Sequence, residues 1–208
     1  MAKQYDRAYF DRWYRDPKQK VKHGGEFVRK VRLALSVAEY YLGRPVESVL
    51  DVGCGEGHWR APLLAERPRL QYLGVDASDY VVRRYGRTRN LHRVAFAELP
   101  RLAAHADRLF GGMPSVDLLV CSDVLHYVPT ADLSAGLPAF RTLCHGVAWI
   151  EMFCRGDDFV GDDDGFIARP RAWYLRTLSR TGWLPLGSNA WLHQGLRERA
   201  SVLELAES

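Results

Sequence analysis

Asp51 and three glycines are spaced in a way that suits binding of a cationic ligand. Asp51 stands at the end of the apolar run Val46–Val52, and Gly53, Gly55 and Gly57 follow before a helical stretch. Glycines at a strand-to-helix turn accept positive φ angles and let the backbone approach a ligand closely. A dinucleotide site needs G-x-G-x-x-G, whereas this sequence has G-x-G-x-G and an acidic residue that would repel a pyrophosphate. The pattern therefore favours a ligand that carries an ammonium or sulfonium cation.

Further polar residues follow the later apolar runs. Asp76 stands at the tip of the second run, in LGVDAS, where a carboxylate can accept hydrogen bonds from both hydroxyls of a ribose. His126 follows the fourth run, in CSDVLHYV, and a neutral imidazole could take a proton from a substrate oxygen or nitrogen. Packing beside the ligand is the alternative for His126. Asp123 either faces outward or caps a helix that begins near Thr130.

An acidic loop follows the fifth apolar run. Its aspartates are Asp157, Asp158, Asp162, Asp163 and Asp164. With Phe159 and Phe166 as aromatic walls, this loop would attract a cationic or amine ligand. A solvated surface loop is the alternative. The spacing does not match an EF-hand calcium loop, and the histidines and cysteines do not cluster as zinc ligands.

The apolar pattern predicts an alternation of strands and helices. The expected strands are Val46–Val52, Leu70–Val75, His92–Phe96, Val116–Ser122 and Val147–Phe153. The expected helices are Glu26–Leu42, Trp59–Glu66, Asp79–Arg87, Pro100–Phe110, Ala131–Cys144 and Pro170–Thr181. Such alternation is typical of a doubly wound α/β sandwich around a parallel sheet. Two final strands, Trp183–Leu186 and Ser201–Leu205, should be antiparallel because no crossover helix joins them.

Length and composition fit a single globular domain. The chain has 208 residues, of which 47% are hydrophobic and 26% charged, and this excludes collagen, coiled coils and intrinsic disorder. No apolar run approaches the roughly 18–20 residues of a membrane span, and no secretory signal is visible. We therefore expect a cytoplasmic protein whose four cysteines are free thiols.

The first 32 residues are basic, with ten Lys and Arg against four Asp and Glu. A nucleic-acid-binding arm is one interpretation. A solvated amphipathic helix is favoured, because aromatic residues form one face: Tyr5, Tyr9, Phe10, Trp13 and Tyr14. This segment could be a lid hinged at His23–Gly24–Gly25, or a helix that stays packed.

Three motifs, VLDVGCGEGHW, YLGVDAS and VDLLVCSDVLHYV, resemble motifs I, II and IV of the class I S-adenosylmethionine-dependent methyltransferases. The resemblance runs from about Val46 to Phe153. It implies a three-layer Rossmann-like sandwich with a seven-stranded, mostly parallel sheet in the order 3-2-1-4-5-7-6, strand 7 being antiparallel. It also implies one methyltransferase domain over residues 1–208, with a helical cap (1–43) and a catalytic core (44–208).

The resemblance further implies which residues hold S-adenosylmethionine, whose product is S-adenosylhomocysteine. These residues are Asp51, Gly53, Gly55, Asp76, Ala77, Glu98, Leu99 and Ser122. Asp51 and the glycines would lie at the methionine part, Asp76 at the ribose, and Ala77 at the adenine. Glu98 and Leu99 stand where the family often has an Asp and an apolar residue at the adenine. Ser122 would face the methionine, and His126 is the candidate catalytic residue.

The resulting hypothesis is methyl transfer to an oxygen or nitrogen atom of a small molecule by a monomer or homodimer, with no metal. Methylation of RNA or protein is an alternative, although the (D/N)PPY motif of many base methyltransferases is absent and nucleic acid is not the expected partner. A non-catalytic S-adenosylmethionine-binding module is a second alternative, and a nicotinamide dehydrogenase is a third.

Overall fold

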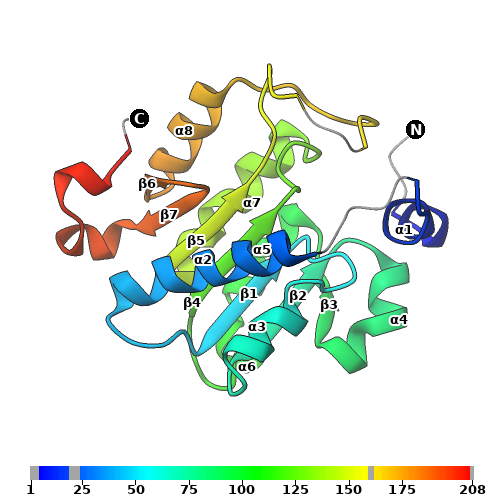
Figure 1. The fold of residues 1–208 in the computed structure, drawn as a ribbon, viewed down its shortest axis with the longest axis horizontal. Helices are drawn as coiled ribbons and strands as arrows, with labels where there is room; N and C mark the ends of the chain where they lie inside the picture. Colours follow the sequence, from blue (N-terminus) through cyan, green and yellow to red (C-terminus); the bar gives the residue numbers. More distant parts are fainter. Residues whose placement is uncertain (1–4, 19–23, 159–161, 207–208) are drawn as a thin grey trace.

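A seven-stranded sheet forms the centre of the protein (Figure 1). The structure is a computed structural model that describes residues 5–18, 24–158 and 162–206. The strands are β1 (Ser48–Val52), β2 (Gln71–Asp76), β3 (Leu91–Arg93), β4 (Val116–Ser122), β5 (Cys144–Glu151), β6 (Trp183–Gly187) and β7 (Ala190–His193). Their order is β3-β2-β1-β4-β5-β7-β6, and β7 runs antiparallel to β5 and β6. The predicted sheet order and its reversed strand are confirmed.

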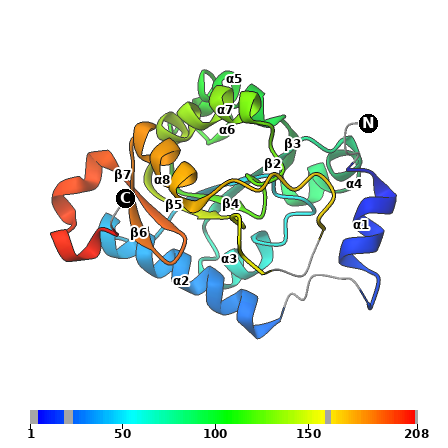
Figure 2. The ribbon, with the colours of Figure 1, turned by 90° about the horizontal axis from the view of Figure 1, so that it is seen from above.

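Helices cover both faces of this sheet (Figure 2). They are α1 (Arg7–Tyr14), α2 (Gly25–Leu42), α3 (Arg60–Glu66), α4 (Asp79–Arg89), α5 (Leu99–Ala103), α6 (Ala106–Leu109), α7 (Thr130–Leu143) and α8 (Arg171–Arg180), with short 3₁₀ turns at Phe96–Glu98, Gln194–Arg199 and Val202–Glu204. One apolar cluster joins the sheet to α1–α4, and a second joins it to α5–α8. Over the described residues, no helix is both long and apolar enough to span a bilayer.

The central strands are apolar along their whole length because both of their faces are covered. All five residues of β1 are buried, and alternate side chains enter opposite clusters: Val49 on the α1–α4 side, Leu50 on the α5–α8 side. The first six residues of β4 are also buried. Parallel strands end at one edge, so β1, β2, β4 and β5 bring their carboxyl ends together there.

The third strand is shorter than predicted. The expected strand His92–Phe96 exists but extends too far, because β3 spans Leu91–Arg93 and the chain then turns into the 3₁₀ segment Phe96–Glu98. The Phe96 ring packs against Phe140 of α7, with 5.7 Å between ring centroids. Its backbone oxygen also lies so close to Gly136 that a β-carbon there would meet it at 2.3 Å. This packing draws Phe96 out of the sheet and into the helical layer.

The last strand follows its partner strand after fewer residues than predicted. Ser201–Leu205 is not a strand but includes the 3₁₀ turn Val202–Glu204, and the returning strand is β7. The turn between β6 and β7 is formed by Ser188 and Asn189, whose φ angles are +48° and +65°. Positive φ at both central residues is the geometry of the tightest hairpins, and asparagine tolerates it.

Two other boundaries differ from the predictions. The expected helix Pro100–Phe110 is divided into α5 and α6, because the backbone closes a 3₁₀ turn from His105 N–H to Leu102. The fifth strand begins at Cys144 and ends at Glu151, rather than spanning Val147–Phe153. Its earlier end matters for the site, since the Phe153 N–H leaves the sheet and donates to His126.

Candidate functional site

The glycine loop after β1 adopts a conformation that side chains would block. Gly53 and Gly55 have φ angles of +69° and +51°. The N–H groups of Gly53 and Cys54 both donate to the carbonyl of Val75 in β2, at 2.8 and 3.1 Å. A β-carbon on Gly53 would stand 2.3 Å from Val124, in the segment after β4. The loop therefore lies tightly between the ends of β2 and β4.

Asp76 joins this loop to the end of β2. One carboxylate oxygen accepts the Gly55 N–H at 2.8 Å, and the other accepts the Ser78 N–H at 2.8 Å. Burial raises the pKa of Asp76, although these two hydrogen bonds oppose the shift. The structure thus brings together two residues that the motifs singled out 21 positions apart. Ala77, the next residue, is exposed.

Asp51 is a buried carboxylate with one hydrogen-bond donor from a side chain. It is 2% exposed, and the Tyr72 hydroxyl donates to it at 2.7 Å. Burial raises the pKa of Asp51 to about 7; the hydrogen bond from Tyr72 lowers it, and the nearby charge of Asp76 raises it further. A cation beside this buried carboxylate would stabilise its ionised form.

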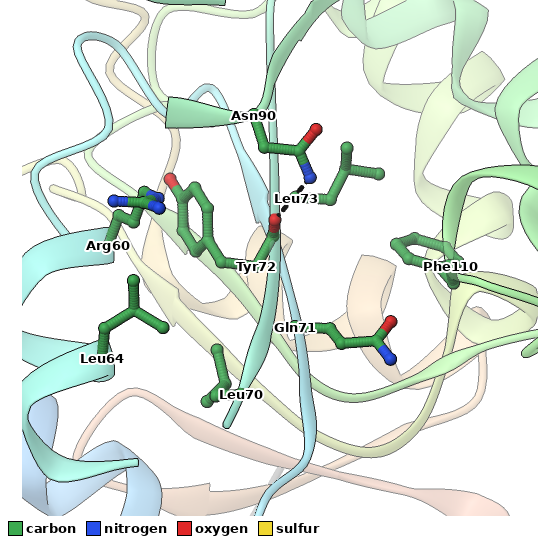
Figure 3. Close-up of a pocket in the computed structure, with 8 residues that line it drawn as sticks. All are labelled: Arg60, Leu64, Leu70, Gln71, Tyr72, Leu73, Asn90 and Phe110. Carbon is green, nitrogen blue, oxygen red and sulfur yellow. Dashed lines mark hydrogen bonds between the residues drawn. The ribbon is translucent and has the colours of Figure 1, made fainter. Parts of the chain in front are cut away.

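Tyr72 also lines a cavity of about 280 Å³ (Figure 3). The Arg60 guanidinium lies beside the tyrosine ring, and the Asn90 side chain donates to the Tyr72 carbonyl at 2.7 Å. Leu70 and Gln71 line the cavity where β2 begins, so it lies toward the edge opposite the glycine loop. None of the residues that the sequence predicted for the site is among those that line this cavity.

Helix α1 lies directly over the glycine loop. A β-carbon on Gly55 would meet the Tyr14 hydroxyl at 3.0 Å and the Phe10 ring at 3.6 Å. Arg15, just after the helix, donates to Glu56 at 2.7 Å, and the Ser78 hydroxyl donates to the Tyr5 carbonyl. The predicted amphipathic aromatic helix is therefore present and covers the loop. The suggested hinge residue His23 lies outside the described residues.

Glu98 and Leu99, two of the residues predicted to contact the adenine, are less accessible to a ligand than Ala77. The Glu98 carboxylate turns back and accepts the Ala95 N–H at 2.9 Å, which closes its own 3₁₀ turn. Leu99 is 1% exposed and packs in the cluster of the α5–α8 face. Ala77 is the best exposed of the three. An adenine role for Glu98 and Leu99 stays a prediction.

The ends of β4 and β5 form a second polar group that the sequence did not predict. Lys30 of α2 donates to both carboxylate oxygens of Glu151, at 2.7 and 2.8 Å. The Ser122 hydroxyl donates to Glu151 at 2.5 Å and lies 3.4 Å from the carboxylate of Asp123. Asp123 does not cap α7, whose first residue is Thr130; its side chain is exposed.

His126 is buried beside this group, with 1% of its surface exposed. Its Nδ1 accepts the Phe153 N–H at 3.3 Å, and its ring centroid lies 4.2 Å from Tyr127 and 5.6 Å from Phe166. Because a backbone N–H donates to Nδ1, the neutral ring carries its proton on Nε2. His126 therefore fastens the segment after β4 to the segment after β5.

The acidic loop is tied to the site through its backbone. The Tyr127 hydroxyl donates to the carbonyl of Asp162. Two of the aspartates shape local turns: Asp157 accepts the Cys154 N–H at 2.7 Å and Asp162 accepts the Asp164 N–H at 3.1 Å. Phe159, predicted as an aromatic wall, lies outside the described residues.

Three residues of the site were missed from the sequence: Lys30, Tyr72 and Glu151. Each one stands in a helix or strand whose pattern is otherwise explained by packing. Glu151 had a usable signal, because it is a charged residue at the end of a buried run, WIEMF, where a side chain enters the ligand-binding edge. Tyr72 and Lys30 had none, since their partners are 21 and 121 residues away.

Comparison with known proteins finds similarity to methyltransferases. A family model described as "Methyltransferase domain" matches residues 50–146, which contain the glycine loop, Asp76 and His126. No curated protein matches the sequence. Among solved structures, the sugar N-methyltransferase KedS8 of Streptoalloteichus sp. ATCC 53650 is similar at 16% identity and a TM-score of 0.62, with 93% of this chain and 94% of that chain covered.

Two other solved structures are similar over most of the chain. Magnesium protoporphyrin IX methyltransferase (ChlM) of Synechocystis PCC 6803, solved with bound SAH, has 20% identity and a TM-score of 0.54, with 86% of both chains covered. An O-methyltransferase family protein of Burkholderia thailandensis has 16% identity and a TM-score of 0.51 over 80% of this chain. This chain spans 55% of the Burkholderia protein. At these identities the likeness shows the fold.

Proposed function

We propose that this chain, a class I methyltransferase by its matched domain and its sheet order, transfers the methyl group of S-adenosylmethionine to an oxygen or nitrogen atom of a small molecule. The observation that carries the proposal is the contact between Asp76 and Gly55, at 2.8 Å. It joins the turn after β1 to the acidic tip of β2 at the carboxyl edge of the sheet, where ligands of open α/β sheets bind.

The residues at this edge fit S-adenosylmethionine in three ways. The backbone at Gly53 and Gly55 can be approached closely because neither residue has a side chain. The buried Asp51 carboxylate has no cation among its described partners, and an α-ammonium group would supply one. Asp76 presents a carboxylate that could exchange its backbone donors for ribose hydroxyls.

The protein's contribution to the reaction is alignment and exclusion of water. When bound, S-adenosylmethionine supplies a methyl group on a positively charged sulfur. Asp51 and Asp76 would fix the two ends of the donor, and Ser122 would lie at its methionine part. The acceptor would stand between the ends of β4 and β5 and helix α1. In-line displacement at an activated carbon needs this positioning more than it needs a catalytic triad.

Helix α1 has to move for the donor to enter. The Tyr14 hydroxyl and the Phe10 ring contact Gly55 at the surface that the methionine part would use. Helix α1 is held there by the ion pair of Arg15 with Glu56 and by the buried Phe10 ring, which stacks on Tyr80. A lid would exchange these contacts for contacts with the donor, and a helix that stays packed is the alternative. A cytoplasmic location and a small-molecule partner belong to the same proposal.

Calorimetry with S-adenosylmethionine, followed by detection of S-adenosylhomocysteine with small alcohols, phenols and amines, tests the proposed function. We expect binding and acceptor-dependent turnover. Binding without turnover across a broad panel would favour a non-catalytic module. Turnover only with RNA or protein, binding that falls steeply with salt, or preference for NADH would each replace the proposal with the corresponding alternative.

Donor affinity should depend on pH through Asp51. Its pKa of about 7 means that the carboxyl is protonated below neutral pH, and a neutral Asp51 attracts no ammonium group. Affinity should therefore fall about tenfold from pH 8 to pH 6, and binding near pH 7 should release protons. Titration calorimetry in two buffers of different ionisation enthalpy measures both effects. Asp51→Asn should bind weakly at every pH; an unchanged pH dependence in this variant would refute the assignment.

His126 should act on the acceptor side of the reaction. His126→Ala is expected to lower kcat about tenfold or more while the donor Kd changes less than about threefold. The pH profile of kcat separates its two roles. If His126 is a catalytic base, the His126→Ala profile should lose one limb. If His126 only positions the chain at Phe153, the profile should keep its shape. Equal losses in turnover and donor affinity would instead make His126 a packing residue beside the cofactor.

A further inference from the structure

Asp123 is held in an unusual backbone conformation at the edge where the strands end. Its φ angle is +61°, in the left-handed region that non-glycine residues seldom adopt. The Asp123 N–H donates to the carbonyl of Glu151 at 2.9 Å, and this bond fixes the end of β4 against the end of β5. Glycine would take this conformation without strain, so the carboxylate at this position is retained at a conformational cost.

The Asp123 carboxylate lacks a strong partner among the described residues. Lys30 is bound to Glu151 through both oxygens, and the single Ser122 proton is donated to Glu151 at 2.5 Å. Ser122 and Asp123 are 3.4 Å apart, so that contact is the weaker one. The charge of Glu151 is thus balanced by Lys30. The Asp123 carboxylate, in contrast, is available to bind a ligand.

Asp123 is also accessible at this edge of the sheet. Its side chain is exposed, yet burial by surrounding groups raises its pKa to about 6; Glu151 adds to this shift, and Lys30 and Ser122 oppose it. Burial raises the pKa of Tyr14 in α1 and of Tyr127 after β4, and the charge of Asp123 adds to both shifts. Asp123 thus presents an accessible carboxylate at the edge where the strands end, one residue before Val124, which lies against Gly53 of the glycine loop.

We propose that Asp123 binds the acceptor, and that the acceptor is an amine methylated on nitrogen. The inference rests on the proposed function and narrows its substrate class. The charged groups that act on Asp123 include the Glu151 carboxylate and the Lys30 ammonium, and the Asp162 charge reaches the neighbouring Tyr127. Carboxylates thus outnumber cations, which favours a basic nitrogen and repels a carboxylate or phenolate acceptor.

The transfer is balanced with Asp123 as the proton acceptor. The amine binds as an ammonium ion, and one of its protons passes to the Asp123 carboxylate and from there to water. The freed nitrogen lone pair then forms the new N–C bond, and the S–C bond breaks with its electron pair passing to sulfur. Asp123 must be ionised for this step, so kcat at saturating donor should rise as the pH passes through about 6.

Matched acceptors that share a skeleton test the class of substrate. Phenethylamine is compared with 2-phenylethanol and phenylacetate, and glucosamine with glucose and glucuronate. Binding to the protein saturated with S-adenosylhomocysteine is measured by calorimetry, and turnover by release of S-adenosylhomocysteine. Within a set that contains a substrate, we expect the amine to bind and react at least about tenfold better than its alcohol or acid.

Asp123→Asn tests the residue. Asparagine tolerates positive φ and keeps the shape, so the variant should fold. It should lower amine binding and kcat/KM at least about tenfold, remove the kcat limb near pH 6, and leave donor affinity within about twofold. Asp107→Asn, an exposed position on α6 at the opposite edge of the sheet (Figure 1), is the matched control and should change none of these.

The outcomes separate this inference from the proposed function. An alcohol or acid that reacts as well as its amine, or an Asp123→Asn variant with full amine turnover, overturns the inference and leaves the methyltransferase activity standing. Loss of donor binding in Asp123→Asn would assign the residue to the cofactor and overturn it as well. A wild-type protein that binds the donor but methylates no member of any set would contradict the proposed function itself.

Discussion

Replacing Asp76 by alanine is expected to weaken S-adenosylmethionine binding by about 1.5–3 kcal/mol, roughly 10- to 150-fold. The carboxylate would lose its charge-assisted hydrogen bonds to the ribose. The substitution also removes the acceptor for the N–H groups of Gly55 and Ser78, both at 2.8 Å, so the turn that receives the donor loses its anchor. Titration calorimetry at pH 8, where Asp51 is ionised, measures the change.

Two variants control this experiment. Asp76→Asn keeps an acceptor oxygen but not the charge, and should lose less affinity than alanine. Asp79→Ala lies three residues away, where the carboxylate is 61% exposed and pairs with Arg93 at 2.9 Å, so its effect should stay below about twofold. If Asp76→Ala binds the donor like the wild type while unfolding at the same urea concentration, the ribose assignment is wrong.

The part of the site around Asp76 could be predicted because its signals are local. Glycines at fixed spacing after an apolar run and an acid at the tip of the next run define positions on two adjacent strands. The sheet then brings Gly55 and Asp76 together, independently of the conformation of the other loops. Glu98 and Leu99 illustrate the limit, since their placement depended on where β3 ends, and packing of Phe96 against α7 decided that.

The fold was predictable for the same reason, and its errors have physical causes. Continuous apolar runs marked β1, β2 and β4 because both faces of these strands are covered. The order of the strands came from the resemblance of three motifs to a known family. The β6–β7 hairpin was misplaced because its turn has only two residues, Ser188 and Asn189, so the returning strand begins at once with Ala190.

Asp117 shows most clearly what the sequence could not reveal. It stands inside the apolar run of β4, and its side chain is only 2% exposed. Its carboxylate accepts hydrogen bonds from the Arg44 guanidinium at 2.6 and 3.0 Å, from the Glu47 N–H at 2.7 Å and from His145 at 3.0 Å. An acid in a buried run demands partners, but these come from about 70 residues earlier and from the start of β5.

Replacing Asp117 by alanine should lower the free energy of unfolding by about 2–4 kcal/mol at pH 7. Burial alone would raise the pKa of Asp117, but the hydrogen bonds from His145, Arg44 and the Glu47 N–H outweigh burial and hold the pKa well below its usual value. A lowered carboxyl pKa stabilises the folded state above the unfolded pKa near 4, and this contribution is lost as the pH falls further.

The difference between wild type and Asp117→Ala should therefore be full from pH 5 to 8 and shrink below pH 4, as urea unfolding at each pH would measure. Arg44→Ala should cost less, since its side chain is 41% exposed and water replaces much of what it loses. Donor affinity of the folded Asp117→Ala protein should stay unchanged, because Asp117 joins the strands at the edge opposite Asp76. A variant with normal stability at pH 7 but poor donor binding would contradict this division between the two edges.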